Sequence, residues 1–380
     1  MRLTHSIRSF VGATRAESAL GFGAITTALF YGFDAALLTD PAVDIKTAAL
    51  FLWVFAAMLW CAFGVVRHAD CLADLLGEPY GTLILTLAVI SIEVTLIASV
   101  MLLGENDPTL ARDTMFAVLM IVLNGMVGIA LVLGAIRHRE QHYNLEGAKA
   151  FLAVLIPLSV LTLVLPNFTR STDLPTFSPV QAVFFALSTI FLYGVFLIIQ
   201  TVRHKLHFLQ PETPRHPTAS ARDPLAHVEV GHEPGHHAAR SVPYHAMFLV
   251  LTILPVVLLS KKLAVFVDFM TEAQGAPIAL GGMIIAILVL SPEGLSALRS
   301  AVANRLQRSV NILLGSALAT IGLTVPAILA IGLILGKNVE LGLDRVETLL
   351  LILTLAVCSL TFSGGRTNVL QGAVHLVLFF

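Results

Sequence analysis

Most of this chain consists of long apolar runs separated by short polar stretches. A helix needs about 20 predominantly apolar residues to cross the ~30 Å hydrocarbon core of a bilayer. Eleven runs approach or exceed that length, so the pattern predicts an all-α, polytopic membrane protein with about 11 transmembrane helices. The predicted spans lie at about 20–38, 45–67, 79–104, 111–137, 148–168, 178–202, 243–260, 276–302, 309–336, 346–363 and 367–380.

Composition agrees with this interpretation. Hydrophobic residues make up 57% of the 380 residues and charged residues 12%, whereas a soluble domain carries about 25% charged residues to keep its surface wetted. Lipid rather than water is therefore expected to cover most of the molecule. The net charge of −1 argues neither for nor against a nucleic-acid partner, but no basic block is interleaved with aromatic residues, so we expect none. Cys61, Cys71 and Cys358 lack the spacing of a metal or redox site, and we expect no cofactor.

Lysine and arginine are unevenly distributed over the predicted loops, and cytoplasmic loops of membrane proteins are enriched in them. Placing the N-terminus inside puts 16 of the 23 basic residues in the cytoplasm and leaves 7 outside. The polar segment 203–242, which contains seven histidines, then also lies inside. We therefore expect an integral protein of a bacterial inner membrane, with its N-terminus and the His-rich loop in the cytoplasm. The pattern does not indicate an oligomeric state.

The third and eighth spans resemble each other when the chain is shifted by 200 residues. Besides several apolar identities, Ser91 then meets Ser291 and Glu93 meets Glu293. These matched residues are polar and lie in the middle of both spans, where chance identity is least expected. The two spans are therefore predicted to be copies of one another.

The spans that follow align at an offset of 192, which places Asn124 on Ser316 and Gly128 on Thr320. The predicted topology runs the third and eighth spans in opposite directions, so the two copies form an inverted repeat. Such repeats are typical of secondary transporters, which hold the substrate at the repeat interface near the midplane. We expect an N-terminal segment with an extra helix, a first five-helix repeat, a cytoplasmic His-rich loop and a second five-helix repeat, at 1–44, 45–202, 203–242 and 243–380.

The two mid-span glutamates are the candidate ion ligands, because a charge at that depth costs about 2.5–3.5 kcal/mol unless a cation, a proton or a polar neighbour compensates it. The simpler alternative is a neutral glutamic acid hydrogen-bonded to another helix. Oxygen ligands suit a hard cation such as Ca²⁺, which takes about 6–8 of them, and no Cys or His nearby in the sequence indicates zinc or copper. The candidate ion-binding residues are Glu93, Glu293, Asn124, Ser316, Ser91 and Ser291, with Thr86, Thr320, Pro292, Leu288 and Glu78 as secondary candidates.

Two of the secondary candidates follow from local chemistry. Pro292 has no backbone N–H, so the carbonyl of Leu288 loses its helical partner, and such a carbonyl is tolerated at membrane depth only where it lines a cavity. A kink without a ligand role is the alternative. Glu78 begins the third span, where it either attracts cations or favours the helix N-terminus.

Charge also predicts how the site works. Two carboxylates close together repel, so an empty, dry site favours protonation of at least one of them. A divalent cation drives those protons off, and binding of cations and of protons is then mutually exclusive. We find no P-loop and no Gly-rich phosphate cradle, which favours a secondary transporter over an ATP-driven pump or another enzyme.

Three segments carry a resemblance to a known family: GEPYGTLILTLAVISIEV (77–94), SPEGLSALRSAVANRLQRSVNILLGSALATIGLTVP (291–326) and GRTNVLQG (365–372). They resemble the calcium/cation antiporter superfamily, and most of all the bacterial ionic calcium/proton antiporters of the cation/proton exchanger type. The resemblance implies that family's fold, ion ligands at Glu93 and Glu293, and support from Asn124 and Ser316. The Gly-Asn pair that precedes the acidic residue in many members is absent, and the His-rich loop replaces the family's acidic cytoplasmic helix.

The prediction is an antiporter that exports Ca²⁺ from the cytoplasm in exchange for protons. Some bacterial relatives exchange Na⁺ or K⁺, so a monovalent cation/proton antiporter is the first alternative. An intramembrane hydrolase is a remote one, because no intramembrane His lies near either mid-span serine in the sequence. The His-rich loop, with HEPGHH at 232–237, suggests a metal sensor, although a polar linker is the simpler interpretation. For Asp34 we favour a packing role, and for His375 a hydrogen-bonded core role.

Overall fold

The computed structural model describes residues 17–33, 43–77, 80–103, 108–211, 241–270, 274–275 and 279–380. Asp34, Glu78 and most of the His-rich loop lie outside the described residues, so the predictions made for them stay predictions. The same holds for the basic residues of the N-terminal segment before residue 17.

Every predicted span corresponds to a helical segment. Seven of the described segments are long and apolar enough to cross a membrane, by length and composition. The all-α, polytopic fold is thereby confirmed, whereas the number of crossings stays a prediction. The main helical elements are α2 (Ser18–Gly32), α4 (Ile45–Leu76), α5 (Tyr80–Leu103), α6 (Leu110–Met120), η1 (Ile121–Met126), α7 (Val127–His138), α8 (Leu145–Leu163), α9 (Pro179–Ile198), α10 (Val242–Asp268), α11 (Ala279–Val302), α12 (Leu306–Ala319), η6 (Thr320–Thr324), α13 (Val325–Leu335), α14 (Arg345–Thr361) and α15 (Val369–Phe379).

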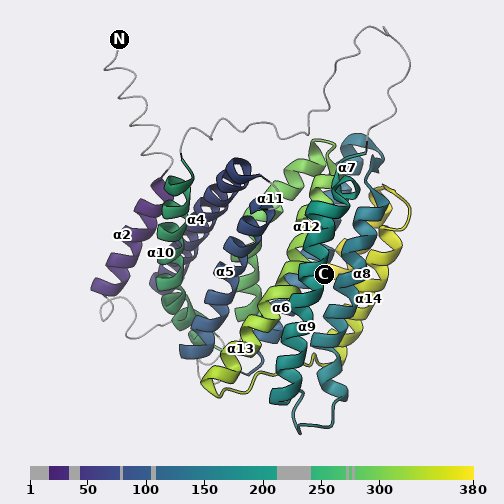
Figure 1. Cartoon of the computed structure of the whole chain (residues 1–380). Helices are drawn as coiled ribbons and strands as arrows, with labels where there is room; N and C mark the ends of the chain where they lie inside the picture. Colours follow the sequence, from purple (N-terminus) through teal and green to yellow (C-terminus); the bar gives the residue numbers. More distant parts are fainter. Residues whose placement is uncertain are drawn as a thin grey trace, which may run out of the picture.

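The helices form two groups with the glutamate-bearing helices between them. In Figure 1, α2, α4 and α10 stand together on the left, α6–α9 and α12–α14 form the larger group on the right, and α5 and α11 lie in the middle. Small residues allow close approach in the left-hand group: a Cβ at Gly23 would lie 3.0 Å from Pro255, and one at Gly64 would lie 3.0 Å from Ala19. Small residues at such contacts are typical of helix packing in membranes.

The direction of α11 follows from its contacts with α6, η1 and α7. Gly282 packs against the backbone of Thr114, and Gly294 packs against Met126. Each contact partner in the second pair lies twelve residues after its counterpart in the first pair. These helices therefore run in the same direction. α5 ends at Leu103 and α6 begins at Leu110, and successive spans so close in the chain run in opposite directions. The two glutamate-bearing helices are therefore antiparallel (Figure 1). An inverted repeat requires this arrangement.

Each of the two long helices that follow the glutamate helices contains a π-helical stretch, η1 in one and η6 in the other. These helices begin at Leu110 and Leu306, 196 residues apart, and end at His138 and Leu335, 197 apart. The predicted offset was 192, about one helical turn less. By the helix bounds, residue 124 corresponds to Thr320 rather than to Ser316.

Two loops cross between the halves of the chain at opposite ends of the bundle. At one end, β1 (Gln141–His142) pairs with β2 (Arg366–Thr367), and the Gln141 side chain donates to the carbonyl of Ala301 at 2.8 Å. At the other end, loop 336–344 of the second half donates backbone hydrogen bonds to three carbonyls of the first half, those of Pro108, Leu163 and Pro175.

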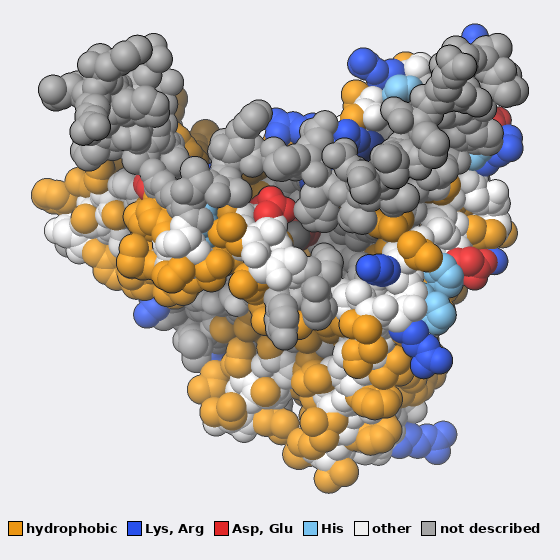
Figure 2. Space-filling model, turned by 45° about the horizontal axis from the view of Figure 1, so that its top comes forward, with side chains coloured by type: hydrophobic (Ala, Val, Ile, Leu, Met, Phe, Trp, Pro, Cys, Tyr) orange, Lys and Arg blue, Asp and Glu red, His pale blue; other side chains and the backbone are white. Residues whose placement is uncertain are grey.

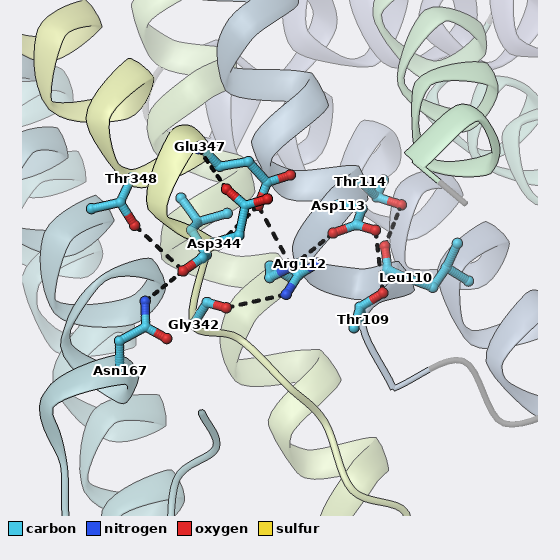
Figure 3. Close-up of polar contacts among 11 residues, drawn as sticks. Thr109, Leu110, Arg112, Asp113, Thr114, Asn167, Gly342, Asp344, Glu347 and Thr348 are labelled. Carbon is cyan, nitrogen blue, oxygen red and sulfur yellow. Dashed lines mark hydrogen bonds and ion pairs between the residues drawn. The ribbon is translucent and has the colours of Figure 1, made fainter. Parts of the chain in front are cut away.

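A partly buried ion pair lies beside loop 336–344 (Figure 3). Arg112 donates to Asp113 at 2.7 Å and to the carbonyl of Gly342 at 3.2 Å, and its Nε lies 3.9 Å from a carboxylate oxygen of Glu347. Asp113 also accepts from the hydroxyl of Thr109 at 3.2 Å. One guanidinium thus joins α6, loop 336–344 and the start of α14.

The outer surface is apolar over much of its area. Figure 2 shows hydrophobic side chains on the flanks and many of the visible Lys and Arg side chains towards the upper face. Large side chains such as Val180, Ile334 and Leu360 are more than two-thirds exposed, as lipid-facing residues are expected to be.

Candidate ion-binding site

Glu93 lies on the buried side of α5 with only 1% of its surface exposed. Its Oε2 accepts a hydrogen bond of 3.1 Å from the hydroxyl of Thr320. Its Oε1 is buried and has no hydrogen-bond partner among the described residues. The Thr324 side chain, one turn further along, faces the same carboxyl group, and its hydroxyl also has no partner in the described part of the chain.

Glu293 on α11 has a similar environment. Its Oε2 is buried and lacks a hydrogen-bond partner within the described ranges, and the side chain of Ser316 faces the carboxyl group. Leaving a buried carboxyl oxygen without a partner is costly. Both acids therefore carry an oxygen that is free to bind a proton or a cation.

One helix face joins the two acids. Ser316, Thr320 and Thr324 are spaced four residues apart on α12 and η6, so they line a single face. Ser316 faces Glu293 and Thr320 faces Glu93, so the two carboxyl groups lie beside neighbouring turns of this helix face. They are near enough to repel each other electrostatically. The structure thus brings together Glu93, Glu293, Ser316 and Thr320.

A cavity of about 430 Å³ between α4 and α11 reaches towards this site. Pro292, the neighbour of Glu293, is one of its lining residues. Asp70 on α4 also lines it, and interacts electrostatically with both Arg308 and Glu293. The cavity's remaining charged residues are Arg67, Arg299 and Arg305, which places its mouth at the end of the bundle predicted to be cytoplasmic.

The structure does not bring Ser91 and Ser291 to the acids. The Ser91 hydroxyl donates to the carbonyl of Leu87 at 2.6 Å, and that of Ser291 donates to the carbonyl of Ile287. Ser91 is exposed whereas Glu93 is buried, because residues two apart on a helix point to opposite sides. Leu288 and Pro292 are both buried in α11, and the helix continues through the proline.

Asn124 belongs to a separate buried network. Its amide nitrogen donates to the hydroxyl of Thr354 at 2.8 Å, and its amide oxygen accepts from Nδ1 of His375 at 3.2 Å. In a neutral imidazole the other nitrogen then accepts, and it lies 2.9 Å from the Thr361 hydroxyl. The amide oxygen is therefore engaged with α15 rather than with an acid, and a ligand role for Asn124 stays a prediction. His375 is fully buried and hydrogen-bonded.

Sequence reasoning missed two residues beside the acids. Thr324 extends the Ser316–Thr320 series by another four residues, and this spacing is visible in the sequence. Tyr193 on α9 is 5% exposed, and its phenol lies near Thr86 and Glu293. The only signal for Tyr193 in the sequence is a phenol within an apolar run. Thr86, one of the secondary candidates, lies near this phenol.

A polytopic helical bundle with two buried, partly unsatisfied carboxyl groups on antiparallel helices defines an integral membrane cation transporter. The chain belongs to the sodium/calcium exchanger protein family: the family model matches residues 46–202 and matches again over 244–380. The two matched stretches are nearly the two predicted repeats. The resemblance inferred from the motifs is confirmed.

Individual relatives agree with this assignment. The chain is 43% identical to the putative ionic transporter y4hA of Sinorhizobium fredii over 88% of this chain and 87% of the relative. It is 40% identical to the sodium-potassium/proton antiporter ChaA of Escherichia coli, covering 87% of each. Its fold is similar to that of the H⁺/Ca²⁺ exchanger CAX, with a TM-score of 0.66, 16% identity, and coverage of 96% of this chain and 87% of that one.

Proposed function

We propose that the protein is a secondary antiporter that exports Ca²⁺ from the cytoplasm in exchange for protons. The observation that carries the proposal is the pair of buried acids that face one hydroxyl-bearing side of α12 and η6. Each acid has a carboxyl oxygen that lacks a partner among the described residues. Two carboxylates neutralise one divalent cation. Their four oxygens and the hydroxyls of Ser316, Thr320 and Thr324 supply up to seven ligands, within the about 6–8 that calcium takes.

Exchange follows from competition for the same oxygens. With no cation present, repulsion between the acids and their exclusion from water favour protonation. A cation that enters through the cavity beside Pro292 displaces these protons. If only the occupied forms change access, each cation that leaves is matched by protons that enter. We place the protein in a bacterial inner membrane, with the cavity mouth in the cytoplasm.

A monovalent cation/proton antiporter is the second candidate, and one observation favours it. The relative from Escherichia coli, which shares 40% identity over most of both chains, is named as a sodium-potassium/proton antiporter. Two carboxylates also serve a monovalent ion if one of them stays protonated. The candidates therefore differ in which cation displaces protons, not in which residues bind it.

Proton flux in proteoliposomes separates the candidates. Purified protein is reconstituted with an entrapped pH dye, a proton gradient is imposed, and Ca²⁺, Na⁺ or K⁺ is added in turn. We expect Ca²⁺ to dissipate the gradient at the lowest concentration, and Glu93→Gln and Glu293→Gln to abolish the response. Glu146→Gln, which alters an exposed glutamate paired with Lys149, serves as the control. A response to Na⁺ or K⁺ alone contradicts the calcium proposal, and activity in both site variants contradicts the site.

A further inference from the structure

A buried polar cluster joins α2, α4 and α10, which stand together in Figure 1, at the end of the bundle where the cavity opens. His68 on α4 and His245 on α10 meet nitrogen to nitrogen, with 3.1 Å between their Nδ1 atoms. The Nε2 of His68 lies 3.0 Å from Oε2 of Glu17, at the start of α2. The two histidines are 1% and 4% exposed. We call Glu17, His68 and His245 the histidine cluster.

A metal site, a helix cap and close packing do not explain this cluster. His68 turns one nitrogen to His245 and the other to Glu17, so the three side chains do not converge on one point. No group of three His, Cys, Asp or Glu residues within the described ranges could hold a metal ion. Glu17 is the N-cap of α2, yet its side chain does not cap the helix. Gly23 and Gly64 already allow these helices to approach closely.

The hydrogen-bond geometry limits how many protons the cluster can hold. A carboxylate oxygen has no hydrogen to donate, so Nε2 of His68 donates to Glu17. The Nδ1 of a neutral His68 then accepts from Nδ1 of His245. One further proton still leaves a single hydrogen between the rings, because a charged ring donates to a neutral one. A second proton places two N–H groups opposite each other across 3.1 Å, and this contact must break.

Arg67 connects the cluster to the cavity. It directly precedes His68, donates to Oε2 of Glu17 at 3.2 Å, and lines the cavity on the α4 side. Besides its three members, the titratable and charged groups around the cluster are Arg67, Cys71 on α4, Tyr244 on α10, whose hydroxyl donates to Glu17 at 2.7 Å, and Arg299 of α11 across the cavity. A rearrangement of the cluster therefore reaches one wall of the path towards Glu293.

We propose that the histidine cluster is a proton-sensitive latch, separate from the ion site, which holds the ends of α2, α4 and α10 together until the histidine pair binds a second proton. Histidine ordinarily gains its proton near pH ~6.5, so acidification of the cytoplasm opens the latch. The end of α4 is then no longer fixed in the cavity wall, and exchange slows. An antiporter that carries protons inwards is thereby inhibited by its own product. The inference rests on the proposed cation/proton exchange but not on which cation is carried.

His245→Asn tests the inference, because an amide either donates or accepts at any pH and does not titrate in this range. Cation-driven proton flux is measured in proteoliposomes at saturating cation, starting from equal pH on both sides. Saturating cation overcomes proton competition at Glu93 and Glu293, so Vmax reports the latch. Between about pH 8 and about pH 5.5 we expect Vmax to fall at least about fivefold in wild type and less than about twofold in His245→Asn. His68→Gln, which keeps a donor for Glu17, should likewise remove the pH dependence of Vmax.

His138→Asn is the matched control, because this part-buried histidine at the same end bonds to the carbonyl of Val302 at 2.9 Å; it should keep the fall of the wild type. Thermal unfolding in detergent gives a readout without transport. The closed latch binds fewer protons than two separated histidines, so acidification should destabilise wild type more than His245→Asn.

Parallel falls of Vmax in wild type and His245→Asn overturn the inference, and so does a wild-type Vmax that does not change with pH. If no cation drives proton flux in the wild type, the proposed function is wrong, and the unfolding comparison alone decides on the latch. Equal acid destabilisation of wild type and His245→Asn then overturns it.

Discussion

Thr320→Val removes the one hydrogen bond that Glu93 receives from the described residues, with little change in side-chain volume. The donor and acceptor lie 3.1 Å apart, and their side chains are 2% and 1% exposed. A hydrogen bond to a charged group contributes about 1.5–3 kcal/mol and one between neutral groups about 0.5–1.5 kcal/mol. The cation-bound, ionised form of Glu93 therefore loses about 1–1.5 kcal/mol more than the protonated form. This difference corresponds to about a five- to tenfold weaker cation affinity at fixed pH.

The assay is initial proton flux against cation concentration in proteoliposomes, at one fixed internal and external pH. The expected result is a KM raised by about five- to tenfold in Thr320→Val, with protein of normal thermal stability. Thr162→Val is the control, because this equally buried threonine bonds only to carbonyls of its own helix, those of Leu158 and Ser159. Equal KM values in wild type, Thr320→Val and Thr162→Val would refute the placement of Thr320 at the cation.

Three further predictions concern stability and the connection between halves. Arg112→Met removes the partly buried Arg112–Asp113 ion pair, so we expect a loss of about 3 kcal/mol in thermal unfolding in detergent. Lys149→Met, from an exposed pair, should change stability by less than about 1 kcal/mol, and equal shifts would contradict this. His375→Leu leaves the Asn124 amide oxygen without its donor and should cost about 1–3 kcal/mol, with a cation KM close to wild type; a large KM change would instead support Asn124 as a ligand. Replacing 212–240 by a Gly/Ser linker should preserve cation-dependent proton flux, because the crossing loops hold the halves together; loss of flux in folded protein would assign that segment an essential role.

Hydropathy was sufficient for the helices because a bilayer requires long apolar runs, and each run corresponds to a helical segment. It was not sufficient for register. An offset of 192 differs from the observed 196–197 by about one turn, and apolar helices look similar after such a shift because their period is 3.6 residues. By the helix bounds, the predicted offset therefore matches Asn124 to a residue one turn before its counterpart, while the repeat itself stays a prediction.

The acids of the candidate site were predictable, and several of their neighbours were not. Glu93 and Glu293 stand out because charge is rare at membrane depth. Ser91 and Ser291 were chosen because they repeat, yet repetition does not say which side of a helix a residue faces. Tyr193 comes from a helix that carries no acid, so only the packing of α9 on η6 reveals it. The argument that Pro292 frees the carbonyl of Leu288 considers one helix alone, so it does not indicate which residues of other helices face that carbonyl.

The crossing loops have a consequence for the order in which the chain matures. While the first half is synthesised, the carbonyls of Pro108, Leu163 and Pro175 have no access to the donors of loop 336–344, which emerge only near the end of translation. Leu341 and Leu343, fully or almost fully buried in the finished protein, likewise find their place late. Closure of the bundle must therefore be among the last events of biogenesis. Truncation before residue 336 should leave these carbonyls of the first half without their backbone donors, and quality-control proteases should recognise the incomplete bundle.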